Sequence, residues 1–392
     1  MKIAFIVEFP TQFEVPFYQN ISEKLKVEGF DAAQPSNKAD KNTEWEFHVI
    51  YNNTDQQDYL DAELGKKIGW GFNLYEGYTY FIADQSNILK SIEAIINKEK
   101  YDFIILNGYK NSYAGLTNLC KSKNIPIALR IDSVLYNLSS IERFLKRIYL
   151  SFVYRQFDHF FAVGSETRKY LHWLGINDSN ISYFSYATHD EWFTMRAKND
   201  VKLKELKQKW GIKTDKVIIS VAKFVERESP WDILEAFKLL NDPEITLVLV
   251  GDGDERKKLE AFAASIPHLK VIFTGYAAYT NLAYYYGLAD IFIHAAKNEP
   301  WGVSVQEALA CGCSVIASDK VGSAKDLIHR GINGFVYNYR NIQQLKTQIL
   351  NCYHIDTDKK REKNIEILSL WSYNSMWENI KNGVIKVLTK RM

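Results

Sequence analysis

The stretch Lys297-Asn-Glu-Pro-Trp-Gly-Val-Ser-Val-Gln-Glu-Ala-Leu-Ala-Cys-Gly-Cys-Ser-Val-Ile-Ala-Ser318 decides the fold. It follows the apolar run Ile291-Phe-Ile-His294, which is typical of a buried strand. Pro300 and Gly302 break the chain after that run, and Val303–Ala310 reads as a helix. The order strand, loop, helix predicts one repeat of a parallel α/β sheet.

Two acids stand on either side of this predicted helix start. Glu299 lies in the loop and Glu307 lies one to two turns into the helix, with seven residues between them. The free N–H groups of a helix N-terminus attract anions, so the acids would flank a group of donors. Such a site suits a polyhydroxylated ligand that bears phosphate, for example a sugar nucleotide. A surface loop acid followed by a solvated helix acid explains the same residues equally well.

Length and composition narrow the class of protein. The 392 residues are too many for one ordinary core and predict two domains. A net charge of +2 gives no reason to expect a nucleic-acid partner. The four cysteines form no disulfide framework, and Cys311-Gly-Cys313 is interpreted as packing because no second pair exists. Without a signal peptide or a membrane-spanning run, a cytoplasmic protein is expected.

The first half alternates short apolar strands with helices, which predicts a doubly wound parallel sheet. Helices are expected at Phe17–Val27 and Ile88–Lys98. No element is assigned between residues 52 and 85, which are rich in Gly and Tyr. The expected strands are Lys2–Val7, Phe47–Tyr51, Phe103–Leu106, Ile127–Ile131 and His159–Val163.

A polar, highly charged stretch from Asp190 to Asp215 predicts the domain boundary, and a second alternation follows it. The domains are therefore placed at 1–195 and 196–372, with 373–392 as a final helix. Strands are expected at Val217–Val221, Thr246–Val250, Lys270–Phe273, Ile291–His294, Ser314–Ala317 and Phe335–Val336. Helices are expected at Asp232–Leu240, Glu255–Ala264, Asn281–Tyr286, Val303–Ala310, Asn341–Cys352 and Trp371–Leu388.

Ile141–Arg155 mixes basic and large apolar residues. One explanation is an amphipathic helix that makes peripheral contact with an anionic inner membrane surface. The other is an ordinary domain helix with a solvated basic face. The second is favoured, because buried helices are common and membrane-surface helices are not.

Loops at the carboxyl ends of the second set of strands contain further candidates. Lys223 and Arg227 follow one strand and could hold a diphosphate and stabilise its charge as it leaves. Gly251, Gly253 and Gly275 follow two others, where glycine lets a ligand approach the backbone closely. Surface charges and plain turns explain each of these loops taken alone.

The second half resembles the nucleotide-binding domain of the retaining GT-B glycosyltransferases of family 4. The resemblance follows the family's order from Val221 to Val336. The matching segments are Glu299 to Glu307 with Gly302; Lys223 with the helix Ser229-Pro-Trp-Asp-Ile-Leu-Glu-Ala-Phe237; Val250-Gly-Asp-Gly253; Phe273-Thr-Gly275; Ala289-Asp-Ile-Phe292; Ala310-Cys-Gly-Cys-Ser-Val-Ile-Ala-Ser318; and Asn333-Gly-Phe-Val336.

The first half resembles the family more loosely. Phe157-Asp-His-Phe-Phe-Ala-Val-Gly-Ser165 and Leu174-Gly-Ile176 are similar to the end of its acceptor domain. Phe9 with Glu14 is similar to the first loop in one branch. The resemblance implies an α/β protein of GT-B fold, in which two Rossmann-like doubly wound parallel-sheet domains face a cleft. The C-terminal helix would cross back to the first domain.

The resemblance also implies an activity and residue roles. The chain would be a hexosyltransferase-type enzyme (EC 2.4) that moves a sugar, with retention, from a nucleotide-diphosphate sugar to an acceptor hydroxyl. Glu307 would bind the ribose and Glu299 the donor sugar, amides at Gly302, Val303 and Ser304 would contact sugar and phosphate, and Lys223 would hold the diphosphate. No metal and no cofactor would be required. A saccharide or lipid-linked acceptor of bacterial polysaccharide, lipopolysaccharide or glycolipid synthesis would be usual.

The sequence departs from the family pattern at three places, one of which is the first loop, Phe9–Pro16, where the paired glycines common in the family are missing. The family commonly has Lys one position after Arg227, where this chain has Glu228, so Arg227 would have to make the second phosphate contact. Asp132 follows a strand where some members have a His nearby. It could polarise an acceptor hydroxyl or cap the next helix, and the cap is favoured. A non-catalytic sugar-nucleotide-binding partner subunit, or a GT-B sugar-nucleotide epimerase, remains the alternative function.

Overall fold

The computed structural model describes residues 1–31, 44–52, 59–61, 66–68, 72–109, 113–136 and 139–391. The chain divides into two compact units. Unit 1 comprises Met1–Gln57, Phe72–Ala187 and Tyr373–Met392, and unit 2 comprises Asp58–Gly71 and Thr188–Ser372. The boundary predicted at 195 falls inside helix α6 (Asp190–Ala197), which belongs to unit 2.

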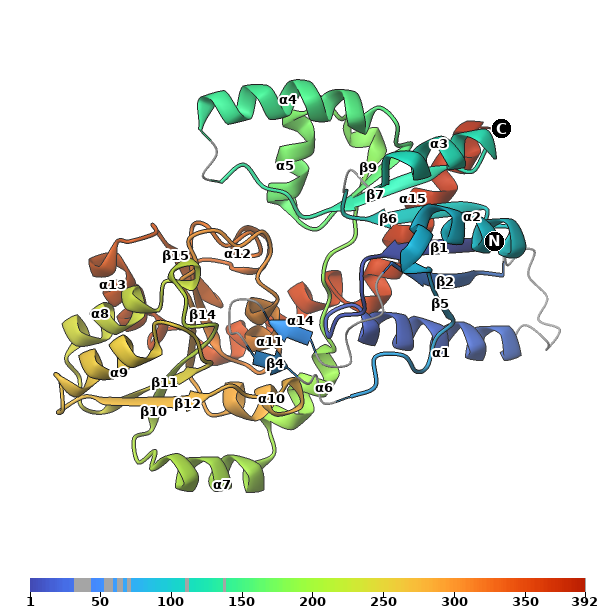
Figure 1. The fold of residues 1–392 in the computed structure, drawn as a ribbon. Helices are drawn as coiled ribbons and strands as arrows, with labels where there is room; N and C mark the ends of the chain where they lie inside the picture. The colour runs from blue at the N-terminus through green and yellow to red at the C-terminus, as the bar shows by residue number, and fades with distance from the viewer. Residues whose placement is uncertain are drawn as a thin grey trace. The chain divides into compact units, whose positions relative to one another are not determined.

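Unit 1 is built on a parallel sheet of seven strands in the order β5-β2-β1-β6-β7-β8-β9 (Figure 1). The predicted strands of this half are present within one residue of their expected bounds, because their apolar runs suit burial on both faces of a parallel sheet. β5 and β9 lie at the two edges and were not predicted. The strands are β1 (Lys2–Val7), β2 (Glu46–Tyr51), β5 (Tyr80–Ile82), β6 (Phe103–Asn107), β7 (Ile127–Ile131), β8 (His159–Ala162) and β9 (Ile181–Tyr183).

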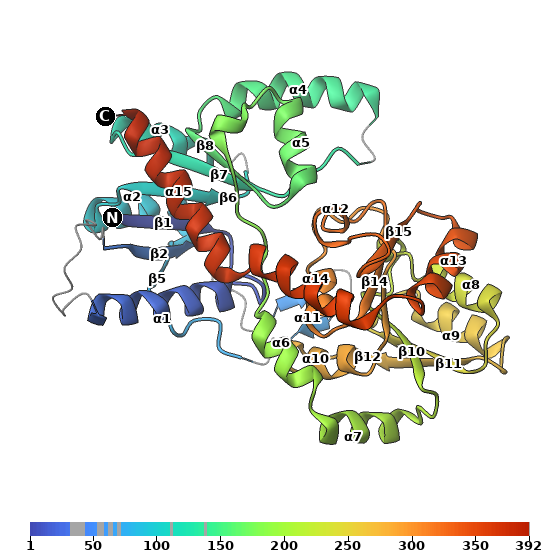
Figure 2. The same cartoon turned by 180° about the vertical axis from the view of Figure 1, so that it is seen from behind.

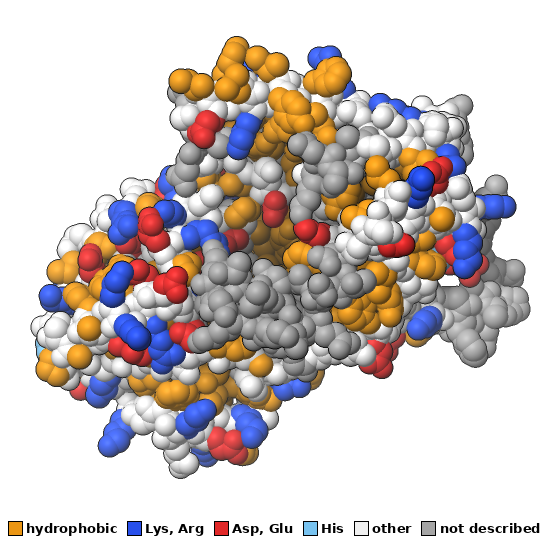
Figure 3. All heavy atoms as spheres, viewed as in Figure 1, with side chains coloured by type: hydrophobic (Ala, Val, Ile, Leu, Met, Phe, Trp, Pro, Cys, Tyr) orange, Lys and Arg blue, Asp and Glu red, His pale blue; other side chains and the backbone are white. Residues whose placement is uncertain are grey.

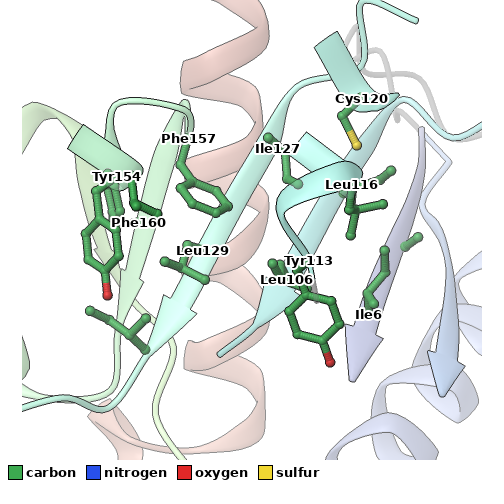
Figure 4. Close-up of a cluster of buried hydrophobic side chains, with 14 of the residues drawn as sticks. Ile6, Leu106, Tyr113, Leu116, Cys120, Ile127, Leu129, Tyr154, Phe157 and Phe160 are labelled. Atoms are coloured by element: carbon green, nitrogen blue, oxygen red, sulfur yellow. The ribbon is translucent and has the colours of Figure 1, made fainter. Parts of the chain in front are cut away.

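Helices of unit 1 pack on this sheet and close its core. Figure 4 shows apolar side chains of β1, β6, β7 and β8 meeting those of the segments that connect the strands. The last helix of the chain, α15, contacts α1, β8 and β9 (Figure 2). The ring centroid of its buried Trp377 lies 5.9 Å from that of Phe47. The helices are α1 (Val15–Asp31), α2 (Ile88–Glu99), α3 (Ala114–Ser122), α4 (Ser140–Tyr154), α5 (Ser165–Trp173) and α15 (Tyr373–Arg391).

Unit 2 is built on a parallel sheet of six strands in the order β12-β11-β10-β13-β14-β15. The strands are β10 (Lys216–Val221), β11 (Ile245–Val250), β12 (Lys270–Gly275), β13 (Ile291–His294), β14 (Ser314–Ser318) and β15 (Gly334–Tyr337). The helices are α6 (Asp190–Ala197), α7 (Asp200–Trp210), α8 (Pro230–Leu240), α9 (Arg256–Ala264), α10 (Tyr279–Gly287), α11 (Val303–Ala310), α12 (Ala324–Leu327), α13 (Ile342–Cys352) and α14 (Thr357–Leu370). A separate antiparallel pair, β3 (Tyr59–Asp61) and β4 (Lys66–Ile68), lies in the stretch that the sequence left unassigned. Both units are therefore Rossmann-like parallel-sheet domains.

Helix α4 contradicts the interpretation of Ile141–Arg155 as an ordinary domain helix. Every residue from 141 to 149 is exposed, including the large apolar ones. Only the C-terminal end of the helix packs, with Val153 and Tyr154 buried in the unit 1 core. In the described part of the chain, no helix is long and apolar enough to cross a membrane.

Candidate active site

Most of the predicted site residues lie at one edge of the unit 2 sheet. Because β10, β11, β12 and β13 are parallel, the loops that follow them leave from their common carboxyl edge. Parallel α/β sheets bind ligands at this edge. Lys223 and Arg227 follow β10, Gly251 and Gly253 follow β11, Gly275 ends β12, and Glu299 follows β13.

The loop between β13 and α11 is fixed by the chain that follows β14. The Glu299 N–H donates to the Lys320 carbonyl at 3.0 Å, and the Gly322 N–H donates to the Glu299 carbonyl at 2.8 Å. Gly302 has a φ of 90°, and a Cβ there would lie 2.9 Å from Val321 Cγ1. A side chain at Gly302 would be strained and crowded, so glycine is required where α11 begins.

Helix α11 presents its N-terminus beside Glu299. Gly302 is the N-cap residue, and no side chain of the described residues caps this end through a hydrogen bond. The first-turn amides of a helix have no partner within it, which leaves the amides at Val303 and Ser304 suited to an anion. The Ser304 hydroxyl lies 3.2 Å from Nδ1 of His294, the last residue of β13.

Arg227 joins the loop after β10 to Glu299. Its Nη2 lies 2.8 Å from Glu228 Oε1 and its Nη1 lies 3.4 Å from Glu299 Oε2. The Lys297 N–H also donates to the Arg227 carbonyl at 2.9 Å, which ties the two loops together. The Arg227 side chain is 36% exposed, whereas Glu228 is buried. Glu228, the acid that stands where the family commonly has lysine, therefore holds Arg227 at the carboxyl edge of the sheet. The partly exposed guanidinium can still contact a ligand there.

Glu228, His294 and Glu299 form a cluster in which one ligand atom from each lies within 4.8 Å of the others. Among the described residues, the buried Nε2 of His294 has no hydrogen-bond partner. Burial lowers the pKa of His294 and raises the pKa of Glu299. Carboxylates and a neutral imidazole can bind a divalent cation, but the Arg227 guanidinium already contacts both carboxylates. Arg227 therefore already supplies positive charge to this cluster.

The glycines after β11 are required by the chain itself. A Cβ on Gly251 would lie 1.9 Å from the Ala222 carbonyl oxygen, and one on Gly253 would lie 2.6 Å from that of Phe224. The two backbones are also bonded, since the Phe224 N–H donates to the Asp252 carbonyl at 2.9 Å. This close packing fixes the backbone on both sides of the half-buried Lys223.

Gly275 completes this backbone arrangement at the end of β12. It accepts a hydrogen bond of 3.0 Å from the Gly251 N–H and has a φ of 79°. A role for these three glycines in binding a ligand stays a prediction.

Glu307 lies on the buried side of α11. It is 3% exposed, and its Oε2 accepts a 2.8 Å hydrogen bond from the Tyr286 hydroxyl of α10. The pKa of Glu307 is raised to about 7, mainly by burial and in part by the nearby Asp190, while the hydrogen bond from Tyr286 lowers it. Sequence reasoning singled out neither Tyr286 nor His294, because both fall in runs that read as core.

The two cysteines at the end of α11 pack against backbone. Cys311 Sγ lies 3.7 Å from the Phe193 carbonyl oxygen, and Cys313 Sγ lies 3.3 Å from that of Tyr286. Both thiols are free, and burial raises the pKa of each. A thiolate, the form that binds metal, is therefore disfavoured at both positions.

The predicted acceptor-side residues lie in unit 1. Glu14 is buried and accepts hydrogen bonds from Arg130 at 2.5 Å and from Asn107 at 2.6 Å. Asp132, just after β7, accepts a 3.2 Å bond from the Tyr186 hydroxyl. Phe9 is half-buried in the loop after β1. These groups surround the carboxyl edge of the unit 1 sheet.

The favoured interpretation of Asp132 as a helix cap is wrong. The next helix, α4, begins with the N-cap Ser139, whose hydroxyl accepts from the Glu142 N–H at 3.3 Å. Glu142 bonds back to the Ser139 N–H at 2.8 Å, so a complete capping box stands there. Asp132 lies seven positions before this cap, and its carboxylate accepts a hydrogen bond from Tyr186 instead.

Two family models match adjoining parts of the chain. Residues 203–367 match "Glycosyl transferases group 1" and residues 41–185 match "Glycosyltransferase Family 4". An alpha-monoglucosyldiacylglycerol synthase of Acholeplasma laidlawii is 31% identical over 179 residues, 44% of this chain and 42% of that protein. A GDP-mannose-dependent alpha-mannosyltransferase of Mycolicibacterium smegmatis is 35% identical over 109 residues, 28% of each protein. The matched segments thus span less than half the length of these relatives.

Solved structures match over almost the whole chain. A glycosyltransferase from Rickettsia africae has a TM-score of 0.74 at 17% identity, over 99% of this chain and 98% of that one. Anabaena Alr3699/HepE, solved in complex with UDP and glucose, has a TM-score of 0.68 at 15% identity, over 97% and 98% of the two chains. These likenesses support the same arrangement of two parallel sheets. Because the family matches fall on both halves and the loops after β10 to β13 meet in the order found from sequence, the chain belongs to the GT-B glycosyltransferases of group 1, family 4.

Proposed function

We propose that the protein transfers a sugar from a nucleotide-diphosphate sugar to an acceptor hydroxyl, with retention of the anomeric configuration. The observation that supports this most strongly is the contact of Arg227 with Glu299 beside the N-terminus of α11. Arg227 supplies a cation, Glu299 supplies a carboxylate that can accept hydrogen bonds from sugar hydroxyls, and the N-terminus of α11 supplies backbone N–H groups. All three lie at the carboxyl edge of the sheet. These are the groups that a diphosphate joined to a sugar requires.

Each group has a proposed part in the reaction. Glu299 accepts hydrogen bonds from donor-sugar hydroxyls, and amides at Gly302, Val303 and Ser304 contact sugar and phosphate. The bond between the anomeric carbon and the phosphate oxygen breaks, a bond from the anomeric carbon to the acceptor oxygen forms, and the proton of the acceptor hydroxyl passes to the leaving phosphate oxygen. Lys223 and Arg227 stabilise the negative charge on the leaving nucleoside diphosphate. Arg227 thus makes the second phosphate contact, because this chain has Glu228 where the family commonly has lysine.

Glu307 is proposed to bind the ribose hydroxyls. It must exchange its hydrogen bond from Tyr286 for bonds from the ligand, since it is buried in this structure. An ionised carboxylate accepts stronger hydrogen bonds than a neutral carboxyl. Gly251, Gly253 and Gly275 are proposed to keep the neighbouring backbone close to the bound donor.

We propose that the transfer needs no metal and no cofactor. The guanidinium of Arg227 already supplies positive charge between Glu228 and Glu299. Turnover measured with a strong chelator should equal turnover without it. Loss of activity on chelation, restored by a divalent ion, would instead assign the cation to the cluster formed by Glu228, His294 and Glu299.

The acceptor is proposed to be a saccharide or a lipid-linked saccharide of bacterial polysaccharide, lipopolysaccharide or glycolipid synthesis. The name of the Acholeplasma relative, a diacylglycerol glucosyl synthase, supports a lipid-linked acceptor. Phe9, Glu14 and Asp132 of unit 1 are the proposed acceptor-side residues, with the buried Glu14 acting by holding Arg130 and Asn107 in place and not by touching the acceptor. We place the enzyme in the cytoplasm, in peripheral contact with the inner membrane surface.

A non-catalytic sugar-nucleotide-binding subunit is the second candidate. The buried acid Glu228, at a position where the family commonly has a lysine, favours it. Such a protein would bind the donor and leave it intact. Release of nucleoside diphosphate in the presence of acceptor separates the two candidates.

The first experiment is thermal unfolding of the purified protein with a panel of nucleoside diphosphates and nucleotide sugars, without added metal. A ligand that binds only the folded state must raise the melting temperature. One nucleotide should give a shift that is lost in Glu307→Ala and kept in the matched control Glu362→Ala, an exposed acid of α14. Absence of any shift across the panel would contradict the donor site.

A further inference from the structure

Helix α4 has large apolar side chains on one exposed face. Positions 141, 144, 145, 148, 149 and 152 fall on the same side of a helix of 3.6 residues per turn. Their exposed fractions run from 52% for Tyr149 to 74% for Ile141. Figure 3 shows hydrophobic side chains gathered over α4. A contiguous exposed apolar surface of this kind marks an interaction site.

The helix is held in place at both ends, so the exposure is not the result of a detached segment. Ser139 and Glu142 form the capping box at its start. At its other end Val153 and Tyr154 are buried in the unit 1 core, and Leu150 packs against it. Between these ends the large apolar side chains of this face are each more than half exposed. Because short helices are marginal without packing, an unpacked face suggests that something else covers it.

The charge of α4 identifies what could cover it. Three basic residues of the helix and Arg155 at its C-cap stand among the apolar ones, against the single acid Glu142, whose carboxylate is used in the cap. A shallow depression on this helix is lined by both kinds of side chain. Its lining residues are Phe144, Arg147, Ile148, Ser151, Phe152 and Arg155. Guanidinium groups beside aromatic and aliphatic side chains are complementary to a lipid bilayer surface, where headgroup phosphates lie next to the acyl chains.

We propose that the exposed face of α4 docks on an anionic phospholipid bilayer. The apolar side chains Phe144, Ile148 and Phe152 enter the boundary between headgroups and acyl chains, while Arg147 and Arg155 pair with lipid phosphates. The proposal rests on the proposed membrane contact and names the element that makes it. A second copy of the chain fits this face less well, because two basic helices would repel each other. The helix lies on the bilayer and does not cross it.

The test is sedimentation of the full chain with lipid vesicles. Wild-type protein should bind vesicles of phosphatidylcholine mixed with phosphatidylglycerol, and binding to phosphatidylcholine alone should be much weaker. Added salt should weaken the binding, because it screens the attraction between lysine or arginine and lipid. Arg147→Gln and Arg155→Gln should each lower the partition coefficient about fivefold.

The apolar contribution is tested with a triple variant and a matched control. Phe144→Ser, Ile148→Ser and Phe152→Ser together should abolish binding, since each removes about tenfold in partitioning. The control is Val201→Ser, Ile365→Ser and Leu370→Ser, which removes three equally exposed apolar side chains from α7 and α14. The control should bind vesicles like wild type. Both triple variants change exposed residues, so both should keep the wild-type melting temperature.

Three outcomes would overturn the proposal: equal binding to both kinds of vesicle, no binding to either, or equal losses in the α4 variant and its control. A dimer in light scattering that disappears in the α4 variant would assign the face to a second copy instead. Nucleotide-induced stabilisation is measured on the wild-type chain beside vesicle binding. If wild type is stabilised by nucleotide but does not bind vesicles, the membrane proposal fails while the donor site stands. If it is absent while vesicles bind, the reverse holds.

Discussion

Both units place an arginine and a glutamate at the carboxyl edge of a parallel sheet, but they use the pair differently. In unit 1, Arg130 is 1% exposed and lies 2.5 Å from Glu14. Its Nε also donates to the Phe184 carbonyl at 2.9 Å, and its guanidinium stacks on the Phe184 ring. In unit 2, Arg227 is 36% exposed and shares its guanidinium between Glu228 and Glu299.

The difference shows how one architecture separates stability from binding. The Arg130 network is closed, because buried partners on several sides satisfy its charge and donors. A buried ion pair of this kind is costly to break. Arg227 keeps part of its surface in solvent, and an ion pair that solvent partly screens adds less stability than a fully buried one. The unit 1 pair is thus expected to maintain the fold, and the unit 2 pair to meet the ligand.

The largest expected effect is on the free energy of unfolding and comes from breaking the ion pair between Arg130 and Glu14. Arg130→Met leaves the buried Glu14 carboxylate without its cation and should lower the free energy of unfolding by about 3–5 kcal/mol. Urea denaturation measures this. Adding Glu14→Leu to the same chain should recover most of the loss, because two apolar residues can replace a buried ion pair.

The control for this variant is Arg168→Met in the same unit. Arg168 pairs with Asp178 at 2.8 Å, but both side chains are exposed. Its loss should cost less than about 1 kcal/mol. Equal losses from the buried and the exposed pair would show that burial does not distinguish them.

The next effect is expected on turnover. Lys223→Ala removes a cation from the proposed diphosphate site and should lower kcat about a hundred- to a thousandfold, with a smaller effect on donor binding. The free energy of unfolding should change by less than about 1 kcal/mol. Steady-state kinetics and denaturation are compared with Lys257→Ala, an exposed lysine of α9. Wild-type kcat in Lys223→Ala would remove this residue from the site.

A smaller effect tests the geometry of Arg227. Arg227→Lys keeps the charge that faces Glu228 and Glu299, so stability should hold. The planar fork of donors is lost, and one weakened charge-assisted hydrogen bond should lower kcat about tenfold. The same change in the exposed Arg361 of α14 should leave kcat unchanged. A large loss of stability in Arg227→Lys would mean that this pair maintains the fold, as the unit 1 pair does.

The smallest effect concerns pH. The hydrogen-bond partner of Glu307 is the neutral Tyr286, and burial raises the pKa of Glu307 from 4.5 to about 7. The folded state therefore holds its proton more tightly than the unfolded state. This stabilisation is fully present below about pH 4.5 and is lost as the pH rises through 7. The melting temperature of Glu307→Gln should fall less over that range than that of wild type.

Part of the remaining pH dependence belongs to Asp190, since burial also raises its pKa to about 7. Affinity for the proposed nucleotide should change in the opposite direction and rise through pH 7, because ionised Glu307 is the better acceptor. If Glu307→Gln and wild type showed the same pH dependence of melting, the carboxyl of Glu307 would be ionised throughout.

Much of the fold could be predicted from the sequence. β1, β7, β13 and α11 have the predicted bounds, because apolar runs and the breakers around them are local signals. The edge strands β5 and β9 are only three residues long, so neither gave a run long enough to be assigned as a strand. The charged stretch after Lys198 forms helix α7. Its sequence pattern does not indicate that the helix belongs to unit 2.

Less of the candidate site could be predicted. The order of Lys223, Gly251, Gly275 and Glu299 along the chain was enough to place them at one sheet edge, because parallel strands end together. The close packing of Gly251 against Ala222 could not be predicted from the sequence, since the two residues lie in different loops. The sequence named Glu307 as a ligand but did not indicate that Tyr286 would bond to it.

By itself the sequence determined which segments are strands and helices, their order, and the loops that contain polar groups, because these depend on neighbours in the chain. Only the tertiary structure decided which partners meet, such as Glu14 and Arg130, which lie 116 residues apart. It also decided that the apolar face of α4 stays uncovered. Periodicity shows that a helix has an apolar face, but whether another element packs against that face depends on the path of the whole chain.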